Sequence, residues 1–218
     1  MKTFKQFLGE DESPQEAREF FERECKPFID KAQGAGVFVR GTDDKIPTLA
    51  HIKLPSGREL EVGFAKVRKD RVPKDVPIEF HNAVEGWMQN EFGISGRAGS
   101  AFVVGDAALR DVYTYGEAHV VIPQGKFKFI WSPEVNDLLD FYNNEASEHL
   151  EFDMSEGDMY AAVDEMLPAK AYRESDLPGA IKSRNEIMVE CEHLLMINLG
   201  EDRAEHRAII DEIKEVLK

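Results

Sequence analysis

The sequence has few cysteines, no long hydrophobic run and a shortage of basic residues. Cys25 and Cys191 are the two cysteines among 218 residues. Two are too few to cross-link a fold of this size, so we expect a protein of a reducing cytosol and exclude a disulfide scaffold. No stretch approaches the roughly 18 uncharged apolar residues of a membrane-spanning helix, and the first residues lack the apolar core of a signal peptide. An integral membrane protein is therefore excluded.

The charge balance narrows the class further. There are 42 acidic and 27 basic side chains, a formal net charge of -15, and 42% of residues are hydrophobic. A protein that mainly grips nucleic-acid phosphates needs a surplus of Lys and Arg, so that class is disfavoured. The apolar fraction and the length predict one soluble globular domain. One basic stretch interrupts the acidity, and we interpret it as a solvated hairpin edge: Lys66, Arg68, Lys69, Arg71 and Lys74.

Helical and strand patterns alternate irregularly along the chain. Ser13, Pro14 and Glu16 form a capping pattern that predicts the start of a first helix. Helices at both ends with strands between them predict an α+β domain, with a mixed β core flanked by N- and C-terminal helices. The other expected helices cover 78–92, 107–115, 136–150, 156–167 and 201–218. The expected strands cover 37–40, 51–54, 58–67, 101–104, 118–122, 127–131 and a long run over 186–199.

The long run over 186–199 has one irregularity. Apolar and polar residues alternate as far as Glu192, but residues 194–197 are continuously apolar. The period therefore breaks near His193, which predicts a bulge or a turn at that point.

Several familiar motifs fail on context. The glycines of GAGVFVRG precede a strand, whereas a dinucleotide-binding fingerprint follows one. GISGRAGS lacks the Gly-Lys-Ser/Thr ending of a phosphate loop. No histidines have the spacing of a zinc site, and no Gly-x-Ser-x-Gly nucleophile elbow is present. We therefore expect no bound metal.

Polar residues at the ends of predicted strands form the best candidate site. Arg40 and Gly41 close the first strand, Ser100 opens SAFVVGD, Tyr115 ends a short helix, and Glu186 opens the late strand of NEIMVE. A guanidinium suits a diphosphate because it offers parallel donors and a permanent charge. A glycine lets a ligand approach the backbone, an aromatic ring can stack on a heterocycle, and a carboxylate can stabilise an oxocarbenium ion.

This arrangement resembles the Arg-Ser-Glu class of the ADP-ribosyltransferase fold family over roughly residues 37–199. VFVRGT is similar to the family's first element, RAGSAFVVGDAALRDVYTYGEAHVVIP to the second, and NEIMVECEHLLMI to the third. The resemblance implies NAD as a substrate, with Arg40 on its phosphates or ribose and the Gly41 backbone on the nicotinamide amide. It further implies that Ser100 supports the site, Tyr115 stacks on nicotinamide and Glu186 is catalytic.

Three departures keep alternatives open. SAFVVGD lacks the Ser-Thr-Ser run of many members, and Glu117 is a competing carboxylate. Arg184 stands where arginine-modifying members carry Glu, which leaves the acceptor open, protein or nucleic acid, and permits plain NAD hydrolysis. The structural alternative is that Arg40 and Glu186 form an ion pair while Tyr115 belongs to the core.

The first ten residues, MKTFKQFLGE, carry a second resemblance. They are similar to the capsid-targeting sequence of internal head proteins in T-even-type phages, which ends in a Leu/Ile-x-Glu site cut by the prohead protease. The resemblance implies a propeptide over residues 1–10 with Glu10 at the processing site, and a single domain over 11–218. The alternative is an ordinary amphipathic starter helix.

Taken together, the two resemblances imply a phage protein that is packaged in the capsid interior and injected into the host cytoplasm. There it would act as a mono-ADP-ribosyltransferase, using NAD to modify a host protein or nucleic acid. Two alternatives remain. One is an injected, non-enzymatic acidic protein that blocks a basic host factor such as a nuclease, and the other is a soluble host enzyme without a link to the virion.

Overall fold

The computed structural model describes residues 14–150 and 154–217, with the backbone alone for residues 14–22. The expected propeptide over residues 1–10, the processing site at Glu10 and the capping residue Ser13 lie outside this part of the chain. The helices are α2 Pro14–Ala32, α3 Ile78–Phe92, α4 Leu138–Asn144, α5 Glu156–Met166, α6 Leu177–Lys182 and α7 His206–Val216. The 3₁₀ helices are η1 Asp106–Ala108, η2 Asp111–Tyr115, η3 Ala146–Glu148 and η4 Leu167–Lys170.

Eight strands form one sheet with the order β2-β3-β8-β5-β1-β4-β7-β6, and every pairing between them is antiparallel. Their bounds are β1 Phe38–Thr42, β2 Thr48–Lys53, β3 Glu59–Lys66, β4 Ala101–Gly105, β5 Glu117–Pro123, β6 Lys128–Trp131, β7 Ile187–Glu190 and β8 His193–Asn198. The sheet and its flanking helices confirm the α+β class. The expected mixed β core is wrong, because all the strand pairings of the described sheet are antiparallel.

β1 joins the two halves of the sheet. Its first residues, Phe38 and Val39, pair with β5 on one side and with β4 on the other. Arg40 and the rest of β1 pair only with β5 in the described structure, because β4 diverges at this point. Arg40 therefore lies where the two halves of the sheet separate. Where neighbouring strands separate, a ligand can reach a side chain that the sheet would otherwise bury.

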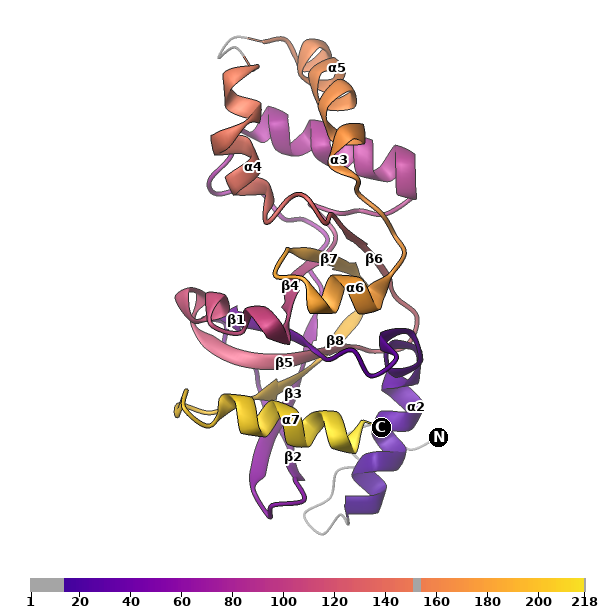
Figure 1. Ribbon diagram of the computed structural model, residues 1–218, viewed down its shortest axis with the longest axis vertical. Helices are drawn as coiled ribbons and strands as arrows, with labels where there is room; N and C mark the ends of the chain where they lie inside the picture. The colour runs from indigo at the N-terminus through magenta and orange to yellow at the C-terminus, as the bar shows by residue number, and fades with distance from the viewer. Residues whose placement is uncertain (1–13, 151–153, 218) are drawn as a thin grey trace.

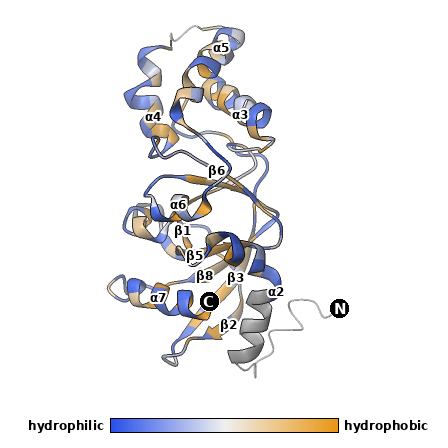
Figure 2. Cartoon of the chain, turned by 45° about the vertical axis from the view of Figure 1, so that its right-hand side comes forward, coloured by the Kyte–Doolittle hydropathy of each residue, from blue (hydrophilic) through white to orange (hydrophobic). Residues whose placement is uncertain are grey.

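The molecule is elongated, with a helical lobe at one end of the sheet (Figure 1). Helices α3, α4 and α5 form this lobe around a hydrophobic cluster that also takes in Ile130 of β6 and Met188 of β7. A larger cluster joins the rest of the sheet with α2, α6 and α7. Apolar residues are concentrated on the strands, and polar and apolar residues alternate along the helices (Figure 2). Burial of these stripes is the main force that holds the helices in place.

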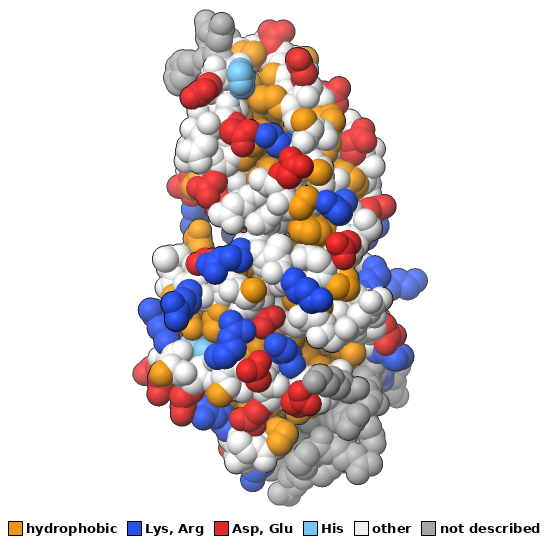
Figure 3. Space-filling view, in the orientation of Figure 1, with side chains coloured by type: hydrophobic (Ala, Val, Ile, Leu, Met, Phe, Trp, Pro, Cys, Tyr) orange, Lys and Arg blue, Asp and Glu red, His pale blue; other side chains and the backbone are white. Residues whose placement is uncertain are grey.

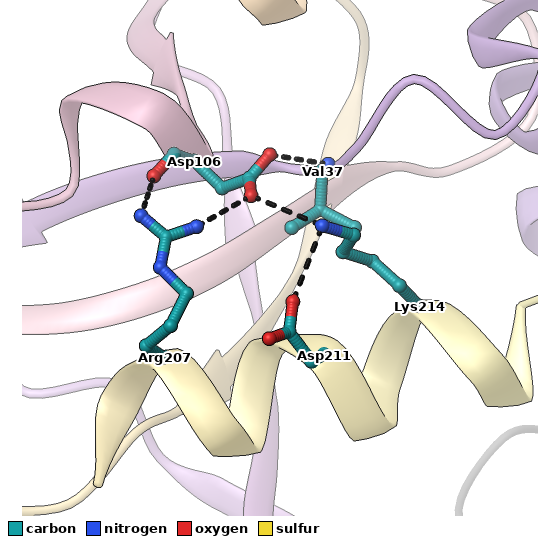
Figure 4. Close-up of polar contacts among 5 residues, drawn as sticks. All are labelled: Val37, Asp106, Arg207, Asp211 and Lys214. Atoms are coloured by element: carbon teal, nitrogen blue, oxygen red, sulfur yellow. Dashed lines mark hydrogen bonds and ion pairs between the residues drawn. The ribbon is translucent and has the colours of Figure 1, made fainter.

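A buried carboxylate attaches α7 to the sheet (Figure 4). The Asp106 side chain, 8% exposed, accepts hydrogen bonds from Val37 N at 3.3 Å and from Arg207 Nη1 at 2.9 Å. Lys214 Nζ lies 3.4 Å from the same carboxylate. Arg207 and Lys214 come from α7, so one carboxylate links the C-terminal helix to the segments at β1 and β4.

Local signals predicted several boundaries correctly. Helix α3 covers 78–92 as expected and ends at Gly93, whose φ of 62° is the left-handed conformation that favours glycine. The β2–β3 hairpin turns at residues 55–57, and Gly57 has a φ of 88°. The period break near His193 is confirmed, because β7 ends at Glu190 and β8 begins at His193.

Other boundaries were wrong. The helix expected over 107–115 is two 3₁₀ helices, and the helix expected over 136–150 is α4 followed by η3. The last helix begins at His206, not at Glu201. Gly200 has a φ of 80°, and the Asp202 side chain accepts from Ala204 N at 3.0 Å, so side-chain and backbone turns compete with the helix over these residues.

Candidate functional site

Arg40 lies on β1, directly opposite His119 of β5. It is half-buried, and its side chain makes no hydrogen bond or ion pair with any residue that the structure describes. Burial lowers the pKa of its guanidinium, and the carboxylate of Asp44 opposes that change. A cation that is partly desolvated and has no hydrogen-bonded anion nearby is a good partner for an anionic ligand.

Gly41 is required for the close approach of η2 to β1. A Cβ at this position would lie 2.0 Å from Val112 O and 3.0 Å from Tyr115 Cβ. Any side chain at residue 41 would therefore displace η2. This packing brings Tyr115 beside the end of β1.

Glu186 precedes β7 and pairs with an arginine that the sequence reasoning missed. Its Oε1 accepts from Arg97 Nη1 at 3.1 Å, and the two side chains are 20% and 12% exposed. The backbone N–H of Glu186 donates to Asn136 O at 2.6 Å, which fixes the residue at the edge of the helical lobe. Burial raises the pKa of Glu186, and the charge of Arg97 opposes this effect.

A third arginine completes a cationic cluster. The guanidinium carbons of Arg71 and Arg97 lie 4.8 and 4.4 Å from the ring centroid of Phe102. Burial, together with the charges of Arg40, Arg68 and Arg97, lowers the pKa of Arg71 to about 10. The Nε atoms of Arg71 and Arg97 are buried without a hydrogen-bond partner among the described residues. We call Arg40, Arg71, Arg97 and Glu186 the arginine cluster.

Glu85 of α3 holds the loop that carries Arg97. Its carboxylate accepts from the backbone N–H of Arg97 at 2.6 Å, from that of Ala98 at 3.1 Å and from Ser95 Oγ at 2.6 Å. Burial would raise the pKa of Glu85, but these hydrogen bonds outweigh it and lower the pKa. The carboxylate therefore stays ionised and fixes the backbone on both sides of Arg97.

Ser100 and Tyr115 occupy different environments. Ser100 is fully buried, and its Oγ donates to Ser95 O at 2.7 Å, so it supports the loop before β4. Tyr115 is 66% exposed. Burial of its hydroxyl raises the pKa of Tyr115, as do the nearby carboxylates of Asp137 and Glu186. Its exposed ring is available for stacking next to the arginine cluster.

The structural alternative from the sequence is wrong. The carboxylate of Glu186 pairs with Arg97 and not with Arg40, and Tyr115 is exposed instead of belonging to the core. The competing carboxylate, Glu117, opens β5 and receives a hydrogen bond from Asn198 Nδ2 at 3.4 Å. It thus belongs to the neighbouring part of the sheet.

The sequence does not mark Arg71 and Arg97 as site residues, because each stands in a segment that was interpreted differently. The expected exposure to solvent holds for Lys66, Arg68, Lys69 and Lys74. The expected hairpin edge is wrong, because β3 lies between β2 and β8 and Lys66 pairs with His193. Arg71 turns inward to Phe102. Arg97 belongs to GISGRAGS, a segment dismissed because it lacks a phosphate-loop ending. The available signal was an arginine three residues before Ser100, at the start of a predicted strand.

One face of the molecule contrasts in charge along its length. In the view of Figure 3, Lys and Arg side chains gather over the middle of the molecule, whereas Asp and Glu predominate over the helical lobe. Within the described ranges, no group of three or more His, Cys, Asp or Glu side chains could hold a metal ion. Nor is any helix of this part of the chain long and apolar enough to cross a membrane.

Comparisons with protein-family models, with curated protein sequences and with solved structures find no match to this chain. The functional interpretation therefore depends on the geometry of the arginine cluster and on the resemblances of the sequence.

Proposed function

We propose that the chain is a mono-ADP-ribosyltransferase that uses NAD to modify a host macromolecule. The observation that carries the proposal is the arginine cluster: one carboxylate, Glu186, hydrogen-bonded to Arg97 and accompanied by Arg71 and Arg40, at the level where β1 and β4 separate. The three guanidinium groups leave a surplus of positive charge in a protein of net charge -15, which suits a diphosphate.

Each residue has a distinct task in this proposal. The guanidinium groups of Arg40, Arg71 and Arg97 bind the diphosphate of NAD and orient it. Tyr115 offers its exposed ring to the nicotinamide. The bond between ribose C1′ and the nicotinamide nitrogen breaks, and its electron pair leaves with nicotinamide. Glu186 stabilises the positive charge that develops on the ribose while the acceptor bonds to C1′ and releases a proton.

A carboxylate-to-amide substitution tests the chemistry. We expect Glu186→Gln to lower the transfer of label from NAD to host lysate by about 100-fold or more, because it removes the charge opposite the developing cation. Glu192→Gln is the matched control, since Glu192 is an exposed carboxylate in the link between β7 and β8. Equal labelling by both variants, or none by the unaltered protein, would refute the proposal.

Thermal stability separates the enzyme from the non-enzymatic alternative. A ligand that binds only the native state raises its melting temperature. We expect NAD to raise the melting temperature of the unaltered protein and of Glu186→Gln, since the arginines remain in both. If NAD has no effect on either, the observation favours the acidic protein that inhibits a basic host factor.

The proposed location depends on residues 1–10. We propose that MKTFKQFLGE directs the chain to the capsid interior and that the prohead protease cleaves after Glu10, before injection into the host cytoplasm. N-terminal sequencing of the protein from purified particles is expected to begin at Asp11. A protein in particles that still begins at Met1, or no protein in particles at all, would contradict this part of the proposal and favour a soluble host enzyme.

A further inference from the structure

A cavity of about 850 Å³ lies beside the arginine cluster, over β2, β3, β5 and β8. His119, the cross-strand neighbour of Arg40, lines it, as does Gly116, the residue after Tyr115. Directly opposed residues of an antiparallel pair project to the same face of the sheet. The cavity therefore lies next to Arg40, on the face of the sheet that Arg40 shares with His119.

The lining of this cavity is acidic, in contrast to the arginine cluster. Five carboxylates line it, against the basic side chains of Lys45 and Arg203. The guanidinium carbon of Arg203 lies 4.6 Å from the ring centroid of Tyr113, so this cation is already engaged. The five carboxylates are those of Asp43, Glu59, Glu61, Glu117 and Glu201.

His119 supplies an independent indication of what the cavity binds. Its side chain is 3% exposed, and Nδ1 lies 3.0 Å from Glu117 O. A carbonyl oxygen can only accept, so Nδ1 carries the proton, and in the neutral ring Nε2 is an acceptor. Burial lowers the pKa of His119, which favours the neutral ring. Nε2 has no hydrogen-bond partner among the described residues.

One kind of ligand can therefore satisfy both the acceptor nitrogen of His119 and the carboxylates. A ligand that satisfies them must donate hydrogen bonds and carry positive charge, as guanidinium and ammonium groups do. A nucleic acid presents phosphates instead, and the carboxylates repel them.

We infer that this acidic cavity binds a basic segment, rich in Arg or Lys, of a protein acceptor and presents it to the neighbouring arginine cluster. This inference rests on the proposed function, because an acceptor exists only if the chain transfers ADP-ribose. It names protein, and not nucleic acid, as the class of acceptor. Binding of a basic segment is itself independent of NAD.

Peptide binding tests the inference directly. A fluorescent peptide of alternating Arg and Gly residues is titrated with the full chain, in parallel with a Ser-Gly peptide of equal length and a single-stranded oligonucleotide. We expect the basic peptide to bind at least about 10-fold more tightly than either, with an affinity that falls as salt is added. Equal affinity for the two peptides, or tighter binding of the oligonucleotide, would overturn the inference.

Neutral variants locate the binding. We expect the double substitution Glu59→Gln with Glu201→Gln to weaken the basic peptide about 3- to 20-fold, because both exposed carboxylates line the cavity. The control is Glu91→Gln with Asp164→Asn, which removes the same charge from exposed positions of α3 and α5 in the helical lobe. An equal loss in both pairs would show that net charge, and not the cavity, determines binding.

The two proposals fail separately. If the basic peptide binds but NAD raises no melting temperature, the cavity stands and the transferase proposal fails. If NAD stabilises the protein and labels a lysate but the peptide does not bind, the transferase stands and the inference about the acceptor is wrong.

Discussion

Replacement of Asp106 by alanine should loosen the attachment of α7 and lower global stability. The carboxylate is 8% exposed and accepts hydrogen bonds from the backbone of Val37 and from Arg207. Without it, the Val37 N–H has lost its side-chain acceptor, and an unsatisfied buried donor costs about 1–3 kcal/mol. Arg207 and Lys214 are 50% and 28% exposed, so both can turn to water, and each lost pair costs only about 0.5–1 kcal/mol.

The combined loss in the free energy of unfolding is therefore about 2–5 kcal/mol. For a chain of 218 residues this corresponds to a melting temperature lower by about 4–20 °C. Asp106→Asn is the informative comparison. Its amide oxygen can still accept from Val37 N, and only the two ionic contacts with α7 are lost, so we expect a cost of about 1–2 kcal/mol.

Urea denaturation provides the assay, followed through the fluorescence of Trp87 and Trp131. We expect the order of stability to be the unaltered protein, then Asp106→Asn, then Asp106→Ala. If both variants lose the same stability, the hydrogen bond to Val37 contributes nothing beyond charge. If Asp106→Ala remains within about 0.5 kcal/mol of the unaltered protein, the buried carboxylate does not hold α7 in the way described.

Two further predictions concern the helical lobe and the sheet. His81 is buried, its Nδ1 has no partner among the described residues, and burial with the charge of Arg97 lowers its pKa. The unfolded chain therefore binds a proton more readily than the folded one, so the free energy of unfolding falls as the pH drops below about 6.5. In urea titrations between pH 7 and 5, we expect His81→Leu to show a shallower fall in that free energy. In Gly105→Ala, the new Cβ would lie 1.7 Å from Ile181 O, so α6 must move, and we expect a loss of about 3 kcal/mol. Gly157→Ala, in α5 with its nearest neighbour 3.9 Å away, should be neutral or stabilising by up to about 1 kcal/mol. Equal stability of the two glycine variants would contradict the contact between α6 and β4.

The elements that the sequence predicts well are those with local causes. The end of helix α3 at Gly93 could be predicted, because the apolar stripe of the helix and the glycine that follows it are enough to specify that end. Strand pairing is different, because the partner is not encoded nearby. β6 follows β5 after a short turn, yet β6 pairs with β7, about sixty residues later, and β5 pairs with β1 and β8. A pattern of alternation predicts that a strand exists and leaves its neighbour open.

The same limit explains which parts of the candidate site were accessible. Tyr115 ends η2 and Glu186 directly precedes β7, so a change of period marks both. Arg40 was expected to close its strand, but it lies within β1, which continues to Thr42. Arg71 and Arg97 stand in loops without periodicity, and they reach Phe102 only after α3 and the sheet have packed. Their interaction with Glu186 is a tertiary event that no local pattern records.

The net charge of -15 is a sum over the whole chain, and it does not show that basic and acidic side chains gather at different places. This separation of charge matters for the proposed chemistry. It argues against a surface that grips nucleic acid through many phosphates, since such binding sums over a wide area. A single diphosphate needs only a few guanidinium groups. Solvent screens the charges of a partly buried cluster of three less than it screens charges in open water. The acidity that disfavours nucleic-acid binding at the scale of the whole chain includes five carboxylates that line the neighbouring cavity. An anionic substrate and a cationic acceptor can thus be held on adjoining parts of one sheet, each in a field of opposite sign.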